Sequence, residues 1–214
     1  MTFSIVKLKK KDAAAVLRFL LQDFLYSEPL NIATGLNHDE AKPMFKDMIK
    51  SCLNVENSLS YAAQNENKEI IGVRLSGILD RPTGQENIPT LPDYGNWKAN
   101  EIFRLVDHVE SQAWKEVPND WDKVMSMAIV SVHRDYCRKG IANTLLNHNL
   151  EEAKKLGCRG IITEATACNS QKLFTKLKYE ALYTILHSKH FLEDGNHFNC
   201  KDDTDRAILF CKEF

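Results

Sequence analysis

The stretch from Val124 to Gly157 constrains the fold most strongly, because it has the pattern of a buried strand, a glycine-containing turn and a helix. Residues 124–132 are almost all small or apolar, which is typical of a strand buried on both faces. Gly157 follows two lysines and is a typical helix C-cap. We therefore predict a strand over 124–132 and one helix over 141–156. The helical spacing relates Ile141, Leu145, Asn149, Ala153 and Leu156.

The turn that opens this helix has the features of a phosphate-binding site. A helix start presents unpaired N–H groups and the positive end of a dipole, and both attract an anion. Gly140 and Ala142 leave room for close approach, and Arg138 and Lys139 add positive charge. An ordinary strand-to-helix turn is the alternative, which the glycine alone does not exclude. The Gly-Lys-Ser/Thr of a P-loop and the Gly-x-Gly-x-x-Gly of a dinucleotide-binding fold are absent.

Composition excludes several classes of protein. A chain of 214 residues with 43% hydrophobic residues fits one large domain. The 28 basic and 29 acidic residues give a net charge of −1, without the basic excess expected of a nucleic-acid-binding protein. The six cysteines lack a Cys-x-x-Cys spacing and indicate reduced thiols. The first residues lack an apolar signal region, and no run approaches about 18 apolar residues. We expect a cytoplasmic protein with no membrane partner.

The remaining patterns predict the other elements. Strands are expected at residues 3–8, 58–64, 69–79, 160–165, 179–186 and 207–212. Helices are expected after an Asp12 cap, after an Asp39 cap with Pro43 in its first turn, from Asn100 to Val117 and from Ser170 to Lys178. The segment 81–97 has no periodicity, and a loop of that length is a candidate substrate lid.

The turn carries a family resemblance. Residues Cys137 to Ala142 follow a valine-rich strand and resemble the Arg/Gln-x-x-Gly-x-Gly/Ala fingerprint of the GNAT superfamily of acetyl-CoA-dependent N-acetyltransferases. In that family the fingerprint holds the diphosphate of CoA. Cys137 departs from the pattern, since Arg or Gln is usual there, which affects a side-chain contact but not the backbone cradle.

The resemblance implies an α/β (α+β) GNAT fold, with a mixed central sheet flanked by helices, as a single domain over residues 1–214. It also implies acetyl-CoA as cosubstrate and an oxyanion contact from a strand amide near Ile129 to Ser131. The residues that it assigns to the cofactor are Ile129, Val130, Ser131, Val132, Cys137, Arg138, Lys139, Gly140, Ile141, Ala142, Asn143 and Ser170.

Amide formation from a thioester requires a neutral amine and therefore a base. An alkylamine has a pKa of about 10.4, so removing its proton at neutral pH costs about 4 to 5 kcal/mol. Glu28 is the candidate base, because it follows an apolar helix and Pro29 biases it away from helical angles. The alternative is a solvated carboxylate at a helix end.

A closer resemblance supports Glu28. Residues 24–31 (FLYSEPLN) resemble the Asp/Ser-Glu-Pro-Leu segment of insect-type arylalkylamine N-acetyltransferases, a group with an agmatine-preferring branch, and there the matching glutamate is the general base. The resemblance also implies two catalytic hydroxyls, at Thr166 and Ser170. Ser170 would protonate the departing thiolate, although a helix N-cap is an equal alternative. Asp203-Thr204 stand where family members have a histidine, so this histidine is missing or shifted to His197.

Other chemistry is less supported. Tyr179 is a candidate acid, but a core aromatic fits its position better. His187 and His190 with Asp194 or His197 have no helical support as metal ligands, so we expect no metal. The acidic run 202–205 reads as a solvated turn. Cys137 and Cys168 are expected to pack or make contacts, because direct attack by an amine needs no acyl-enzyme.

We therefore predict an acetyl-CoA-dependent N-acetyltransferase of small arylalkylamines such as dopamine, serotonin or tyramine. Transfer would be direct, in a ternary complex of a monomer or weak dimer. The alternatives are a polyamine or agmatine acetyltransferase of the same fold, and an inactive CoA-binding module. Acidic residues around the acceptor would favour a dication, and aromatic residues would favour an arylalkylamine.

Overall fold

One seven-stranded mixed sheet organises the chain. The computed structural model describes residues 2–84, 90–193 and 195–214. The strand order is β1-β2-β3-β4-β5-β7-β6, and every neighbouring pair is antiparallel except β4–β5, which is parallel. The strands are β1 (Ser4–Lys7), β2 (Tyr61–Gln64), β3 (Ile70–Asp80), β4 (Lys123–Val132), β5 (Gly160–Ala165), β6 (Glu180–Leu186) and β7 (Arg206–Glu213). These positions confirm the seven predicted strands and the mixed sheet.

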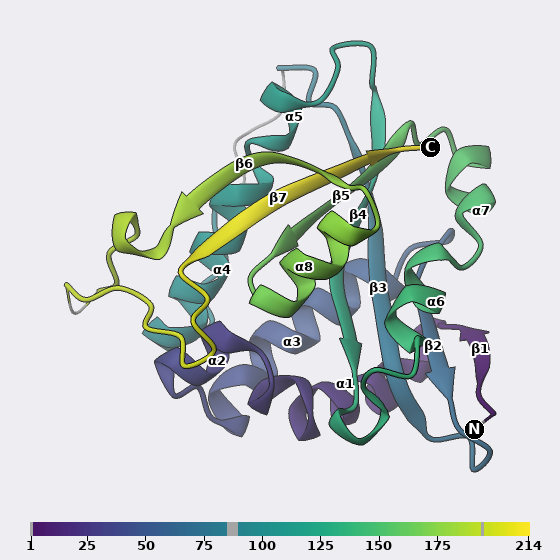
Figure 1. The fold of residues 1–214 in the computed structure, drawn as a ribbon, viewed down its shortest axis with the longest axis horizontal. Helices are drawn as coiled ribbons and strands as arrows, with labels where there is room; N and C mark the ends of the chain where they lie inside the picture. The colour runs from purple at the N-terminus through teal and green to yellow at the C-terminus, as the bar shows by residue number, and fades with distance from the viewer. Residues whose placement is uncertain (1, 85–89, 194) are drawn as a thin grey trace.

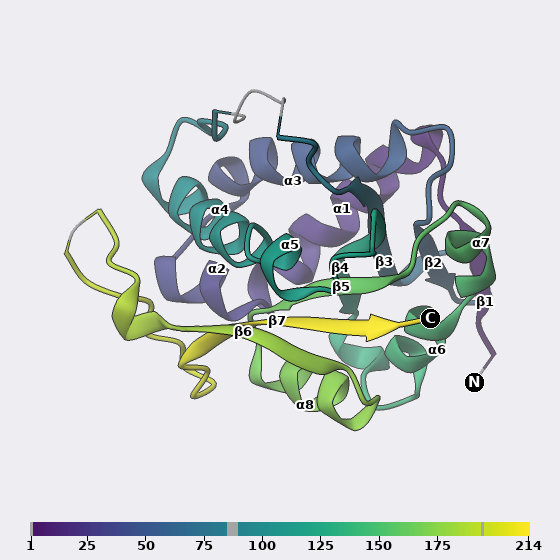
Figure 2. The same ribbon diagram turned by 90° about the horizontal axis from the view of Figure 1, so that it is seen from above.

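Helices cover both faces of the sheet (Figure 2). One layer consists of α1 (Ala13–Gln22), α2 (Pro29–Thr34), α3 (His38–Leu53), α4 (Trp97–Glu110) and α5 (Ala113–Glu116). The other consists of α6 (Ile141–Asn147), α7 (Leu150–Lys155) and α8 (Cys168–Lys176). The largest apolar cluster lies under the first layer, and two smaller clusters lie under the second. No helix among the described residues combines the length and the apolar character needed to cross a bilayer.

Two predicted helix starts, at Asp39 and Asn100, were wrong, because an earlier asparagine side chain satisfies the first amides of each helix. Asn37, not Asp39, caps α3: its Oδ1 accepts from the amides of Asp39 and Glu40 at 3.0 and 3.1 Å. Pro43 therefore lies inside α3 beyond its first turn. Asn96 caps α4, with Oδ1 2.9 Å from the Ala99 amide, so this helix begins before Asn100. Asn37 stands two residues before the predicted Asp39, and Asn96 stands four residues before the predicted Asn100.

The Asp12 carboxylate bonds an amide that precedes it in the chain and makes no capping hydrogen bond to α1. It accepts from the Lys9 amide at 2.8 Å and closes a short 3-10 turn, Lys10–Asp12, directly before α1. At the other end of its layer, the predicted helix 100–117 is interrupted after Glu110 and continues as the short α5.

The single helix predicted over 141–156 is two helices. Figure 1 shows α6 and α7 as separate helices. Asn149, directly before α7, adopts a left-handed φ of 51°. The cause is Arg74 of β3, whose guanidinium is fully buried and donates to the carbonyls of Leu145 at 2.7 Å and His148 at 2.9 Å. The Leu145 carbonyl also accepts from the His148 amide at 3.3 Å, so Arg74 adds a charged donor to the carbonyls at the end of this helix. Arg74 therefore fixes the end of α6 and, through it, the turn at its start.

Replacing Arg74 by Met should destabilise the protein by at least about 3 kcal/mol, because several buried carbonyls lose a charged donor. Chemical denaturation monitored by circular dichroism measures this change. The exposed Arg18 provides a matched control, and Arg18→Met should stay within about 0.5 kcal/mol of the wild type. Equal stability of the two variants would show that Arg74 is not a structural anchor.

Candidate active site

Strands β4 and β5 pair only briefly and then separate. Their register contains two pairs, Met125 with Ile161 and Ser126 with Ile162. Beyond them β4 follows β3, with an irregularity opposite Leu75 and Ser76 that leaves Ala128 as the extra residue. Figure 1 shows the two strands spreading apart toward their carboxyl ends. A gap in the sheet therefore opens beside residues 129–132.

One set of amides of β4 faces this gap. The amide of His133 donates to Ile71 of β3 at 2.9 Å. Because donors alternate between the two sides of a strand, the amides of Ser131 and Ile129 also point to β3. The amide of Val130 then points to the side that β5 has left. Of the strand amides predicted to contact an oxyanion, Val130 is the one with this orientation.

The turn before α6 presents a row of amides. Among the described residues, the N–H groups of residues 138–143 have no hydrogen-bond acceptor. Arg138 and Gly140 both have left-handed φ values, 60° and 80°, which curve the backbone around them. A Cβ added at Gly140 would have no atom within 4 Å, so the space beside this amide is open. The predicted anion cradle thus has suitable backbone geometry.

Two side chains of the turn donate hydrogen bonds to nearby backbone carbonyls. The Cys137 thiol donates to the carbonyls of Val132 and His133 at 3.5 and 3.6 Å, and burial raises its pKa. The Lys139 ammonium donates to the Asp135 carbonyl at 2.8 Å and lies over the ring of Tyr136. The cradle therefore consists mainly of main-chain groups, with the exposed Arg138 beside it.

Glu28 lies at the start of α2, where Pro29 requires an extended backbone (φ −85°, ψ 126°). One carboxylate oxygen accepts from the Asn31 amide at 2.7 Å, and the other accepts from the Thr166 hydroxyl at 3.0 Å. The residue is only 8% exposed, and burial raises the pKa of its carboxyl from 4.5 to about 7, against the opposing effect of these donors. Such a group can take a proton near neutral pH.

The two predicted hydroxyls lie in different surroundings. Thr166 contacts Glu28 directly, although the segments are 138 residues apart in the chain. Ser170 lies inside α8 and donates to the Ala167 carbonyl at 2.8 Å, so the N-cap interpretation was wrong. Helix α8 begins at Cys168, whose amide is satisfied by the Thr204 hydroxyl at 2.9 Å.

A cavity of about 590 Å³ lies between α3, α4 and the sheet, with Glu28 and Thr166 in its wall. Its described lining contains three phenylalanines and seven carboxylates, but one lysine. The phenylalanines are Phe24, Phe45 and Phe103, and the carboxylates are Glu28, Asp47, Glu56, Asp80, Asp107, Glu110 and Glu164. This composition suits a cationic organic ligand.

Glu110 and Glu164 were not predicted. Glu110 lies one turn after Val106 on the inward face of α4. Glu164 lies two residues after Ile162, on the same face of a buried strand. Each is an acidic residue at a position that the hydrophobic pattern assigns to the core. An acid in such a position was the signal that could have identified them.

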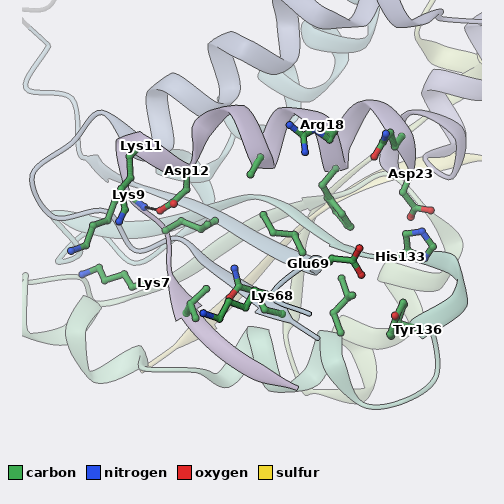
Figure 3. Close-up of a pocket in the computed structure, with 18 of the residues that line it drawn as sticks. Lys7, Lys9, Lys11, Asp12, Arg18, Asp23, Lys68, Glu69, His133 and Tyr136 are labelled. Carbon is green, nitrogen blue, oxygen red and sulfur yellow. Dashed lines mark hydrogen bonds between the residues drawn. The ribbon is translucent and has the colours of Figure 1, made fainter. Parts of the chain in front are cut away.

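A second cavity, of about 720 Å³, lies between α1 and the edge of the sheet around β1 (Figure 3). Its charged lining includes Lys7, Lys9, Lys11, Arg18 and Lys68. The buried Asp23 at one end accepts from the Arg134 side chain at 3.0 Å. Glu28 and Thr166 line the first cavity and not this one, so the cavity at Glu28 is the candidate active site. Ser170 is not among the described lining residues of either cavity.

The other predicted candidates lie elsewhere. Tyr179 is buried beside Phe174, and burial raises its pKa to about 12, as fits a core aromatic. His190 lies 3.4 Å from Glu101, and His197 is exposed. Among the described residues no cluster of His, Cys, Asp or Glu is arranged to hold a metal, and Asp194 lies outside them.

Solved structures share this fold. The chain matches arylalkylamine N-acetyltransferase 2 from Aedes aegypti with a TM-score of 0.82 and 22% identity, over 100% of this chain and 99% of the other. A Drosophila melanogaster polyamine N-acetyltransferase, which forms N-acetylagmatine, matches at 0.79 and 16% identity over 100% of both chains. Arabidopsis thaliana NAA60 in complex with acetyl-CoA matches at 0.60 and 14% identity, over 100% and 99%.

These identities establish the fold and leave the substrate open. The family assignment comes from the sequence profile described as "Acetyltransferase (GNAT) family", which matches residues 24–179. That range includes Glu28, the strand β4, the turn before α6 and Thr166. The chain belongs to the GNAT family of acetyltransferases.

Proposed function

We propose that this protein is an acetyl-CoA-dependent N-acetyltransferase of small primary amines, and that residues 1–214 act as one catalytic domain. The observation that carries the proposal is the buried Glu28 carboxyl, with a pKa of about 7, in the wall of a cavity that also contains Ala128, the β4 residue directly before the gap. A base and an opening for a thioester are thereby brought to one place.

The backbone supplies the proposed cosubstrate site. The unpaired amides of residues 138–143 would hold the diphosphate of CoA at the start of α6. The Val130 amide, which faces the gap between β4 and β5, would donate to the thioester oxygen as negative charge develops on it. Acetyl-CoA supplies the activated acetyl group.

Glu28 makes deprotonation of the acceptor less costly. Transfer of a proton from an amine of pKa about 10.4 to an ordinary glutamate costs about 8 kcal/mol, whereas transfer to a carboxyl of pKa about 7 costs about 5 kcal/mol. Each Glu28 oxygen keeps a lone pair beyond its bond to Asn31 or Thr166, so either can accept the proton. Thr166 holds the carboxylate in place.

The proposed reaction is direct. The neutral nitrogen attacks the thioester carbonyl, a C–N bond forms and the C–S bond breaks. The acceptor ammonium first gives one proton to Glu28, which later releases it to solvent. After the attack the nitrogen loses a second proton, and we propose that the Ser170 hydroxyl relays it: Ser170 gives its own proton to the thiolate and takes up the proton from the nitrogen. For this step Ser170 must turn from the Ala167 carbonyl. The Cys137 thiol donates hydrogen bonds to carbonyls at the end of β4, and no acyl-enzyme on Cys137 forms in the proposed reaction.

The cavity supports two acceptor classes. Its phenylalanines suit the arylalkylamine that the sequence predicted, and its seven carboxylates suit the alternative, a polyamine or agmatine. Both are primary amines and use the same base.

Release of free thiol from acetyl-CoA tests the activity with dopamine, serotonin, tyramine, agmatine and spermidine. We expect turnover with at least one of these amines. Tight CoA binding without thiol release for any of them would instead support an inactive CoA-binding module.

Replacing Glu28 by Gln should lower kcat/KM by roughly 10²–10⁴ near neutral pH. In the wild type kcat/KM should fall as the pH decreases below about 7, because Glu28 becomes protonated, and the variant should lack this inflection. Thr166→Val removes a donor that lowers the Glu28 pKa, so its inflection should move to higher pH. An unchanged pH profile in Glu28→Gln would refute the assignment.

Stability provides a separate measure of the same pKa. The folded-state pKa is raised, so the stability due to protonated Glu28 is complete below about 4.5 and is lost as the pH rises through about 7. Between pH 4.5 and pH 7 the free energy of unfolding of the wild type should therefore fall by up to about 3 kcal/mol relative to that of Glu28→Gln. Urea denaturation at several pH values measures the difference.

Replacing Gly140 by Ala should weaken CoA binding by about tenfold or more, because a side chain strains the left-handed turn that shapes the amide row. Gly157→Ala is the matched control, since Gly157 also has a positive φ, 89°, but lies at the end of α7. Isothermal titration with CoA should show a loss only for Gly140→Ala. An equal loss in both variants would mean that general strain, not the turn, affects binding.

A further inference from the structure

We propose that Glu110 and Glu164 form a subsite for a second cationic group on the acceptor, so that the preferred substrate is a short linear diamine or aminoguanidine. This inference rests on the proposed amine acetyltransferase activity and specifies its substrate class.

The two carboxylates come to the cavity from opposite sides. Glu164 lies on β5, on the face that carries Ile162 and packs under the α3–α4 layer. Glu110 lies in the last turn of α4. Its Oε2 accepts from the Ser126 hydroxyl of β4 at 3.0 Å, which fixes the carboxylate toward the sheet. Three elements thus hold this part of the cavity.

Glu164 has an unused acceptor. Its Oε1 is shielded from solvent and has no hydrogen-bond partner among the described residues, although the residue lines the cavity. Leaving a buried acceptor unpaired is costly, so native structures usually satisfy such atoms. A donor on a bound ligand would satisfy it.

The neighbouring charges do not neutralise the pair. Burial raises the pKa of both carboxyls, and the charge of Glu110 raises that of Glu164 further, while Asp107 acts in the same direction on Glu110. Lys123 is the one cation among the described lining residues, and it lies 3.3 Å from Asp80. Two neighbouring, partly buried carboxylates need a counter-charge to ionise together. An ammonium or guanidinium group of the ligand has both the charge and the donors.

The spacing indicates the length of the acceptor. Glu164 and Thr166 are two residues apart along the chain at the end of β5, about 7 Å between Cα atoms, and the Thr166 hydroxyl lies 3.0 Å from Glu28. A linear acceptor with about four to six carbon atoms between its nitrogens can place one nitrogen at Glu28 and the other at the pair. An arylalkyl monoamine would leave the pair without a counter-charge.

Steady-state kinetics with Glu164→Gln and Glu110→Gln test the subsite. The substrates are butane-1,4-diamine and agmatine, with 2-phenylethylamine as the monoamine. We expect each variant to raise KM for the dications by about 10- to 100-fold, to leave kcat within about twofold, and not to raise KM for 2-phenylethylamine. Glu66→Gln is the matched control, because it removes an exposed carboxylate from the turn between β2 and β3, outside the cavity, and should change neither KM.

Proton release gives a readout that is independent of turnover. Isothermal titration with butane-1,4-diamine, repeated in two buffers of different ionisation enthalpy, gives the number of protons released on binding. We expect the wild type to release protons and Glu164→Gln to release fewer. Thermal melts check that the variants are folded. Equal KM changes for dications and monoamine, or equal proton release in wild type and Glu164→Gln, would overturn the subsite.

The two proposals can fail separately. If the wild type acetylates 2-phenylethylamine and the Gln variants behave as wild type with every amine, the subsite is wrong and the acetyltransferase stands. If the diamine binds with proton release that depends on Glu164, but no thiol is released, the subsite is correct and the proposed activity is wrong.

Discussion

The separation of β4 from β5 is the constraint on which the rest of the structure depends. Two residue pairs join the strands, and the extra residue at Ala128 then directs β4 along β3. Without this divergence the Val130 amide would be consumed in the sheet. With it, the gap lies between the amide row before α6 on one side of the sheet and the cavity containing Glu28 on the other. The site is therefore a consequence of incomplete strand pairing.

Burial of carboxyl groups is the physical basis of the proposed chemistry. A cavity wall that shields Glu28 raises its pKa toward neutrality, and the Asn31 amide and the Thr166 hydroxyl keep the carboxylate fixed and limit the increase. Burial also raises the pKa of Glu110 and of Glu164, and the charge of Glu110 raises the pKa of Glu164 further. One region of low dielectric can thus hold a base near neutral pKa and a pair of acids that ionise fully only beside a cation.

Local patterns were sufficient for the strands and for the turn between β4 and α6, because alternation and a glycine between a strand and a helix are short-range signals. Phosphate binding at this turn stays a prediction. Local patterns failed where distant groups decide the outcome. The helix after Gly140 ends at Asn147 because Arg74, a residue of β3, occupies its last carbonyls. Glu28 could be singled out from its neighbours in the chain, but its contact with Thr166 and the presence of Glu110 and Glu164 in the same cavity arise only from the packing of α2 and α4 on the sheet.

The most direct test of the account is a crystal structure of the protein with CoA and butane-1,4-diamine. The account predicts diphosphate oxygens within hydrogen-bonding distance of the amides of residues 138–143. It also predicts a thiol directed through the gap beside Val130, with one diamine nitrogen at Glu28, directly or through one water. A diphosphate bound elsewhere, or a Glu28 carboxylate with no path to the diamine nitrogen, would contradict it.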